Sequence, residues 1–342
     1  MPDPQSLTAS DLPSPRPAND TATPLAVVDT DRAARICVIA NAASGRNSRD
    51  AEAITRAMDV FGDRAELRYW STNTDIAEDV SQALHDGFDT IVAAGGDGTV
   101  MAIASAMMGK DAAMAVLPLG TFNYFARGLG LPEDPEAAAR LILQGGHHRI
   151  AVATVNGQVF LNNASLGVYP SILKERETTY ARFGRHRIAA YWSVVKTFLR
   201  FQRPMRVVLT ADGVETRLRS PLIFVARSAY QLDYFGLKGG DAISHDAFAM
   251  FVARDRGRGG LFRLAWRLIR RRLRPGDGLE LIRAREITIS TRQKSPLIAF
   301  DGEKIRMRSP LTFKIQPEAL TIIAPESPIP ASGIDSAERR DG

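Results

Sequence analysis

The sequence has a single cysteine and no apolar run of membrane-spanning length. Cys37 lies within an apolar run at residues 36–39, so a disulfide within the chain is impossible and a small buried side chain is expected. No apolar run reaches the roughly 20 residues that a membrane helix needs. The N-terminal segment lacks the basic start and apolar core of a secretory signal, which favours a cytoplasmic protein.

The overall composition is that of an ordinary globular protein, whereas the two terminal segments have a biased composition and the arginines are clustered. Apolar residues make up 45% and charged residues 24% of the 342 residues, as in a globular protein with two domains. Residues 1–31 and 326–342 are rich in small and polar residues, so both are predicted to be disordered. The net charge is +6, and nine arginines lie between residues 254 and 274, which indicates an anionic partner.

Apolar and amphipathic segments alternate in the first half of the chain. The pattern predicts strands at 35–40, 66–70, 89–94 and 113–117, and helices at 49–61, 75–86 and 100–108. Such alternation is typical of an α/β domain, here residues 32–147, with a doubly wound parallel sheet covered on both faces. Ligands bind these sheets beyond the carboxyl ends of the strands. Four loops should meet at that edge, namely residues 41–47, 71–74, 95–99 and 118–123.

The second half has a different pattern. Residues 148–315 predict a mainly antiparallel β-domain that carries helices at 178–201 and 260–273, and residues 316–325 are expected to complete the first domain. Asn156-Gly157 and Asp212-Gly213 are typical hairpin turns. Strands are predicted at 150–155, 158–165, 205–211, 216–219, 222–226, 247–252, 286–290, 297–300 and 311–315.

The sequence Gly-Gly-Asp-Gly-Thr at residues 95–99 joins a predicted strand to a predicted helix. A glycine-rich turn at a helix N-terminus offers bare backbone N–H groups to a phosphate. Asp97 is unusual in a simple anion cradle, and its carboxylate suits a magnesium ion that lies between it and phosphates. The alternative is a sharp Asp-Gly turn without a ligand. The motif therefore indicates a phosphoryl-transfer enzyme, provided that the other loops agree.

Three further loops have a similar character. Residues 41–47 contain Ser44, which could donate to a phosphate or could cap the next helix. Gly120 and Thr121 offer a backbone and a hydroxyl donor, although Thr121 could also be a helix cap. Asp301 and Glu303 flank a predicted turn, where they could share a proton or divide the roles of base and metal ligand. The alternative for this pair is a solvated Asp-Gly turn.

Together these motifs resemble the bacterial diacylglycerol kinase catalytic-domain family of lipid kinases, to which sphingosine and ceramide kinases belong and NAD kinases are distantly related. The resemblance covers roughly residues 35–324 and includes residues 161–167 and 184–201. Four motifs in order are more specific than any one of them. They are Asn-x-x-Ser-Gly at 41–45, Gly-Gly-Asp-Gly-Thr at 95–99, Pro-Leu-Gly-Thr-x-Asn-x-x-Ala-Arg at 118–127, and Asp-Gly-Glu at 301–303.

The resemblance implies a two-domain lipid kinase that uses ATP and Mg2+ in the cleft between its domains. Asp97 would handle the magnesium, and Asp301 or Glu303 would take the proton from the lipid hydroxyl. Asp246 is the nearest match to a second, structural magnesium site. The implied ATP-binding residues are Asn41, Ala42, Ala43, Ser44, Gly45, Thr72, Gly95, Gly96, Asp97, Gly98, Thr99, Gly120, Thr121 and Asn123.

Three positions depart from the family pattern. Met101-Ala102 stands where many members have Asn-Glu, Tyr124 stands where many have Asp, and Asp246 lacks the following glycine. The accepted lipid therefore stays open between diacylglycerol, a sphingoid base and a related lipid. An NAD kinase-like enzyme and a non-catalytic lipid or nucleotide sensor stay open as alternatives.

Residues 260–274 form a predicted basic amphipathic helix. On a helical wheel, arginines gather opposite a stripe that contains Phe262 and Trp266. Such a helix can lie on an anionic membrane surface at the inner face of the membrane, or it can pack its apolar side on the β-domain and show arginines to water. No aromatic stacking platform accompanies the arginines, so nucleic acid is not an expected partner. The lipid substrate at the membrane is the expected partner, and a homodimer is left open.

Overall fold

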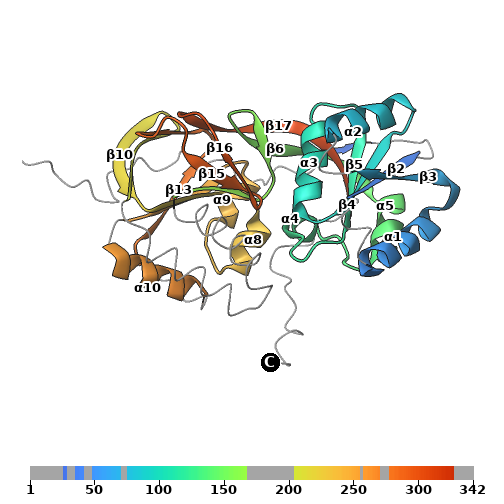
Figure 1. The fold of residues 1–342 in the computed structure, drawn as a ribbon, viewed down its shortest axis with the longest axis horizontal. Coiled ribbons are helices and arrows are strands. Elements are labelled where there is room, and N and C mark those ends of the chain that lie inside the picture. The colour runs from blue at the N-terminus through green and yellow to red at the C-terminus, as the bar shows by residue number, and fades with distance from the viewer. Residues whose placement is uncertain are drawn as a thin grey trace, which may run out of the picture.

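A computed structural model of the chain shows two lobes side by side (Figure 1). It describes residues 26–28, 35–41, 48–70, 75–167, 204–254, 257–269 and 277–326. The predicted helix at 178–201 therefore lies outside the described residues. Of the segment 1–31, only β1 (Ala26–Val28) is described, and it pairs antiparallel with β6 (Gly146–Val155) rather than being disordered.

The first lobe has the predicted parallel sheet at its centre. The strand order is β3-β2-β4-β5, so the chain reverses direction across the sheet between β2 and β4. Ligands bind α/β sheets at such a switch point. The strands are β2 (Ile36–Asn41), β3 (Ala65–Trp70), β4 (Thr90–Gly95) and β5 (Ala113–Pro118), and the helices are α1 (Ser48–Phe61), η2 (Gly62–Arg64), α2 (Ile76–His85), α3 (Asp97–Met107), α4 (Tyr124–Gly128) and α5 (Pro135–Gln144).

Alternate side chains of each central strand explain why both faces are covered. In β2, Val38 packs with α1 and α5 on one face, whereas Cys37 and Ile39 pack with α2 and α3 on the other. Cys37 is a buried free thiol, as expected. The α5 helix was not predicted, although Asp134 caps it by accepting from the Ala137 N–H and Pro135 opens it.

One long strand, β17 (Leu311–Ala324), joins the two lobes. Its first part pairs antiparallel with β14 (Ile287–Thr291), its length pairs with β6, and Thr321-Ile322 pair parallel with β5. The prediction ended this strand at residue 315, and Pro317 and Glu318 follow that position. The structure instead keeps the strand and absorbs these residues in a register shift between Gln316 and Leu320, which is a bulge.

The second lobe is an antiparallel β-sandwich. One side is β10-β9-β14, continued by β17, β6 and β7; the other is the sheet β13-β12-β11-β8-β15-β16. Asn156-Gly157 and Asp212-Gly213 are confirmed as two-residue hairpin turns with positive φ. The remaining elements are β7 (Gln158–Phe160), β8 (Asn163–Gly167), β9 (Met205–Ala211), β10 (Val214–Ser220), β11 (Leu222–Ala226), α8 (Ala229–Tyr234), α9 (Gly240–Ser244), β12 (Phe248–Ala253), α10 (Gly257–Ile269), β13 (Leu279–Ala284), β15 (Leu297–Phe300) and β16 (Glu303–Arg306).

Several of these elements differ from the prediction. The single strand expected at 158–165 is two strands, β7 and β8, because the chain turns at Leu161-Asn162 to enter the other sheet. β13 and β16 were not predicted, and both are edge strands with half-exposed, charged side chains that blur the strand pattern. Within the described ranges, each helix is too short or too polar to cross a lipid bilayer.

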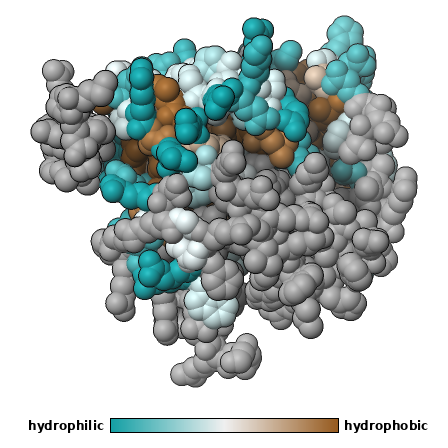
Figure 2. All heavy atoms as spheres, turned by 60° about the vertical axis from the view of Figure 1, so that its left-hand side comes forward, coloured by the Kyte–Doolittle hydropathy of each residue, from teal (hydrophilic) through white to brown (hydrophobic). Residues whose placement is uncertain are grey.

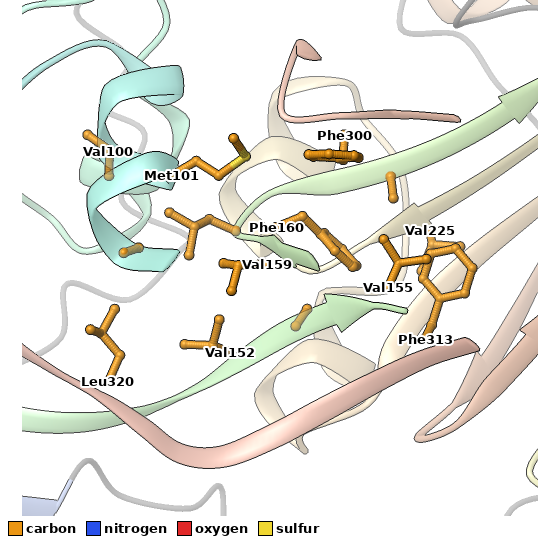
Figure 3. Packing of buried hydrophobic residues seen from close by; sticks show 14 of the residues in the cluster. Val100, Met101, Val152, Val155, Val159, Phe160, Val225, Phe300, Phe313 and Leu320 are labelled. Carbon is orange, nitrogen blue, oxygen red and sulfur yellow. The ribbon is translucent and has the colours of Figure 1, made fainter. Parts of the chain in front are cut away.

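Three phenylalanines fill the interior of the sandwich. The rings of Phe160, Phe248 and Phe313 lie 6.1 to 6.3 Å apart, and all three are fully buried. Figure 3 shows that the same apolar cluster continues to Val100 and Met101 on α3, so one core passes through both lobes. The lobes are therefore held together by shared packing as well as by β17.

We predict that Phe313→Ala lowers the free energy of unfolding by about 3–5 kcal/mol, because it leaves a cavity between two other rings. Urea denaturation measures the change. Val214→Ala, at an exposed position on edge strand β10, is the control and should cost less than about 1 kcal/mol. Equal losses in the two variants would contradict the packing described for Phe313.

Candidate active site

Two glycine-containing loops meet at the carboxyl ends of β4 and β5. A Cβ placed on Gly120 would lie 2.5 Å from the Gly96 Cα, which is closer than real side chains come. The Leu119 N–H also donates to the Gly95 carbonyl at 3.0 Å. Only glycine permits this backbone contact, so both motifs are brought to one edge of the sheet.

Asn123 holds the second loop in shape. Its Oδ1 accepts from the Gly120 N–H at 2.9 Å, and its Nδ2 donates to the Gly120 carbonyl at 2.8 Å. Asn123 has a φ of 48° and occupies the position before α4. Thr121 is exposed and precedes that position by two residues, so it is not the cap that the sequence allowed. Asn123 therefore braces the loop, and Thr121 is left accessible.

Asp97 is the first residue of α3, which begins three residues earlier than predicted. Its Oδ1 accepts from the Phe125 N–H at 3.3 Å and from the Asn162 Nδ2 at 3.5 Å. Burial raises the pKa of the Asp97 carboxyl, although nearby N–H groups of α4 oppose the shift. One carboxylate thus contacts the β5 loop and the second lobe while it stands at the glycine-rich turn.

Asp301 and Gly302 form the two-residue turn between β15 and β16, with φ values of 46° and 92°. The turn itself was an open alternative, but the Asp301 carboxylate is not solvated. It accepts three backbone N–H groups: Leu161 at 2.5 Å, Asn162 at 2.8 Å and Asn163 at 3.0 Å. Burial nevertheless raises the pKa of Asp301 to about 6, and the nearby Asp97 adds to this shift. Asp301 therefore fixes the β7–β8 junction.

Glu303 differs from Asp301 because its side chain is exposed. Its Oε1 lies 3.9 Å from the place where a Cβ on Gly98 would stand, so it faces the glycine-rich turn of the first lobe. Among the residues that the structure describes, its carboxylate has no hydrogen-bond partner. Of the two carboxylates at this turn, Glu303 is therefore the exposed one, whereas the Asp301 carboxylate is engaged by backbone N–H groups.

The other predicted nucleotide residues fall into two groups. Asn41 lies at the end of β2, next to the β4 turn, and buried Thr99 packs its side chain over Gly95. The structure therefore brings these two to the same edge as Gly96, Gly98 and Gly120. The predicted residues Ala42, Ala43, Ser44, Gly45 and Thr72 lie outside the described residues.

The predicted metal ligand Asp246 has a different partner. Its Oδ1 accepts from Arg227 Nη2 at 2.6 Å, and Arg227 Nη1 donates to the Ile243 carbonyl at 2.9 Å. Arg227 is almost fully buried, so its guanidinium supplies the positive charge at this place. A magnesium ion would compete with the Arg227 guanidinium for the Asp246 carboxylate and the Ile243 carbonyl. The described residues around Asp246 therefore do not suit a magnesium ion.

The Asp97 region fits a magnesium ion better. The Asp97 carboxylate offers oxygen, which Mg2+ prefers, and the amide whose Nδ2 faces Asp97 also carries Asn162 Oδ1, a buried atom without a partner among the described residues. The described residues hold no cluster of three or more Asp, Glu, His or Cys side chains suited to a metal. The site therefore suits an ion that arrives with ligands of its own, as the magnesium of a nucleoside triphosphate does.

The two family departures near the turn are used for packing. Met101 is buried, and Figure 3 shows its side chain extending from α3 toward the second lobe. Tyr124 stacks on Phe122 with the ring centroids 5.4 Å apart, and its ring lies 5.8 Å from that of Tyr234 in α8 and 6.4 Å from that of Phe235, which follows α8. This aromatic cluster contacts both lobes beside Asp97. Neither the cluster nor the role of Asn162 was predicted, although residues 161–167 had been noted as similar to the family.

The basic helix α10 is described in part. Leu264 is buried, Arg263 and Trp266 are exposed, and Arg267 pairs with Asp277. Arg270, Arg271, Arg272 and Arg274 lie outside the described residues. Figure 2 brings this side of the molecule forward and shows apolar patches among hydrophilic side chains on its described surface. Among the side chains of α10 that the structure describes, Leu264 is buried and Trp266 is exposed.

Comparisons with known proteins find two family models that match the chain. Residues 35–155 match the family Diacylglycerol kinase catalytic domain, and residues 171–324 match the family YegS C-terminal NAD kinase beta sandwich-like domain. The chain is similar to a protein of Enterobacter sp. (strain 638) named Probable lipid kinase YegS-like, with 37% identity over 143 residues. A protein of the same name from Pseudomonas aeruginosa (strain UCBPP-PA14) is 48% identical over 90 residues.

These matches cover parts of the chains. The aligned residues are 40% of this chain and 48% of the Enterobacter protein, and 26% and 30% for the Pseudomonas protein, so the chain spans about half or less of these curated relatives. A crystal structure of a diacylglycerol kinase from Bacillus anthracis str. Sterne has a TM-score of 0.64 at 20% identity. It covers 86% of this chain and 98% of that chain, which shows the same fold.

We predict that Gly120→Ala lowers the free energy of unfolding by about 1–3 kcal/mol, because the new Cβ would force the two loops apart. Nucleotide affinity, measured by calorimetry, should fall as well. Gly259→Ala in α10 is the control: a Cβ there would meet no heavy atom of the described chain within 4 Å, and stability should stay or rise. An unchanged Gly120→Ala protein would contradict the close approach.

The raised pKa of Asp301 predicts a pH effect on stability. Between about pH 4 and pH 6 the folded protein holds a proton on Asp301 that the unfolded chain has released, so this residue stabilises the fold less as the pH rises. The unfolding free energy of wild type minus that of Asp301→Asn should therefore fall, on the order of 2 kcal/mol, from pH 4 to pH 7. Guanidinium titrations at several pH values measure it, and a pH-independent difference would argue against the shift.

Proposed function

Since the chain belongs to the diacylglycerol kinase catalytic-domain family, we propose that it is an ATP-dependent lipid kinase. It transfers the γ-phosphate of ATP to a hydroxyl group of diacylglycerol, a sphingoid base or a related lipid. The observation that carries the proposal is the position of Glu303. This exposed carboxylate of the second lobe faces Gly98 in the glycine-rich turn of the first lobe, beside Asp97.

The first lobe supplies the nucleotide side of the reaction. The turn at residues 95–99 ends at the N-terminus of α3, where backbone N–H groups and the helix dipole favour phosphate. The close contact between Gly96 and Gly120 keeps side chains out of this place. Asp97 would hold magnesium, which supplies charge neutralisation at the phosphates when bound.

The second lobe supplies the acceptor side. Glu303 accepts the proton of the lipid hydroxyl as that oxygen attacks the γ-phosphorus and the bond from the γ-phosphorus to ADP breaks. Asp301 acts as a positioning residue. Its three hydrogen bonds hold the β15–β16 turn against residues 161–163, and thereby aim Glu303 at the first lobe. Catalysis in phosphoryl transfer comes mostly from positioning and charge neutralisation, so this rigid frame is expected to matter as much as the base.

The acceptor lies in a membrane, so the protein must reach a bilayer. We propose that α10 makes a peripheral contact with an anionic surface at the cytoplasmic face. Exposed Trp266 and Arg263 support this, because an aromatic ring and a guanidinium on one helix suit the boundary between headgroups and acyl chains.

An NAD kinase-like activity is the second candidate, and it has one supporting observation. The second lobe matches a family whose sandwich is described as NAD kinase-like. That likeness concerns the fold of the lobe, whereas the relatives that match the chain are named lipid kinases. Offering NAD together with mixed lipids in one assay separates the two activities.

We predict that Glu303→Gln lowers phosphate transfer by at least about 100-fold, because the amide cannot accept the hydroxyl proton. Affinity for ATP should stay within about twofold. Labelled ATP with a mixed lipid extract and magnesium, followed by thin-layer chromatography, measures transfer. Glu52→Gln, on the exposed face of α1, should leave it unchanged. If folded wild-type protein labels no lipid, the proposed function is wrong.

A further inference from the structure

Asn162 stands where the two lobes meet, and its backbone is fully engaged. Its N–H donates to Asp301 at 2.8 Å, and its carbonyl accepts from the Arg227 N–H at 2.8 Å. The side chain is 2% exposed, so no bulk water reaches it. These contacts fix where the Asn162 amide can lie, and it lies against Asp97.

The neighbours of the amide also fix its orientation. The group 3.5 Å from Asp97 Oδ1 must be the nitrogen, because an ionised carboxylate only accepts hydrogen bonds. The amide oxygen then points elsewhere, and it has no hydrogen-bond partner among the described residues. Buried polar atoms are nearly always paired, so an unpaired oxygen at a functional site indicates a ligand that completes it.

The groups around this oxygen restrict what the ligand can be. Asp97, Asp301 and the Asn162 oxygen all accept hydrogen bonds. A phosphate also only accepts, so it does not suit this place. A lipid hydroxyl has a single proton, which the proposed reaction assigns to Glu303. A magnesium ion that keeps several bound waters presents donors in every direction and carries the charge that the carboxylates favour.

We propose that Asn162 is a magnesium-recognition residue of this site: its Oδ1 accepts a hydrogen bond from the water shell of the ion that accompanies ATP. The inference rests on the proposed function, since it assumes that the site binds ATP with magnesium. It assigns a purpose to a residue outside the glycine-rich turn and outside the Asp-Gly-Glu motif. It also couples the metal to the second lobe, because the Asn162 backbone is bound to Asp301.

The test measures ATP affinity of the full-length protein by calorimetry, in a magnesium titration and in EDTA. Magnesium should increase the affinity for ATP. For Asn162→Ala we expect the magnesium concentration that gives half of this increase to rise about tenfold, as when hydrogen-bond partners of metal-bound groups are removed. The affinity for ATP in EDTA should stay within twofold.

Asn163→Ala is the matched control. Asn163 is the adjacent buried asparagine, but its Nδ2 donates to Gln231 Oε1 at 2.9 Å, away from Asp97. Both alanine variants should lose thermal stability, and only Asn162→Ala should change the magnesium dependence. This contrast separates a general structural effect from a role toward the ion.

Other results would overturn the proposal. If Asn162→Ala leaves the magnesium requirement unchanged, or if it weakens ATP binding equally with magnesium and with EDTA, a buried water completes the oxygen and Asn162 is only structural. If the wild type binds ATP without any effect of magnesium, the inference is also wrong. If the wild type shows magnesium-dependent ATP binding and labels no lipid, the lipid kinase proposal fails alone, because the Asn162 measurement needs no lipid.

Discussion

Three backbone N–H groups converge on the Asp301 carboxylate, and the arrangement of the site depends on this contact. Asp301 occupies the turn that starts β16, and the three groups belong to the junction between β7 and β8. The contact therefore locks two distant parts of the second lobe together. It places Glu303, two residues after Asp301, and Asn162, a residue of the junction, so that both face the glycine-rich turn that begins α3.

The position of one lobe on the other is fixed by packing. β17 leaves the sandwich and pairs with β5, Met101 of α3 enters the apolar core that the lobes share, and Tyr124 packs on two rings at the C-terminal end of α8. Met101 and Tyr124 are thus used for contact between the lobes near the glycine-rich turn. The remaining polar groups, the partly buried Asp97 and the buried Asn162, are thereby held in a defined environment, where electrostatic interactions are stronger than in water.

The sequence predicted the first lobe well because β2, β4 and β5 are buried on both faces and each is followed by a loop that contains small residues. It also indicated Asp97, Glu303 and the glycines by their motifs. It did not reveal that Asp301 is consumed by backbone hydrogen bonds, since its partners lie about 140 positions away in the chain. Asn162 and Arg227 have no local signal, because their roles follow from tertiary contacts. The prediction did not continue β17 beyond residue 315, because the bulge that carries the strand past Pro317 is set by its pairing with β6.

A crystal structure of the full chain with magnesium and a non-hydrolysable ATP analogue tests the central claim most directly. The account predicts the triphosphate at residues 95–99, the terminal phosphate facing Glu303, and the ion between Asp97 and the phosphates within reach of Asn162 through water. A nucleotide bound elsewhere, or a terminal phosphate turned away from Glu303, would contradict it.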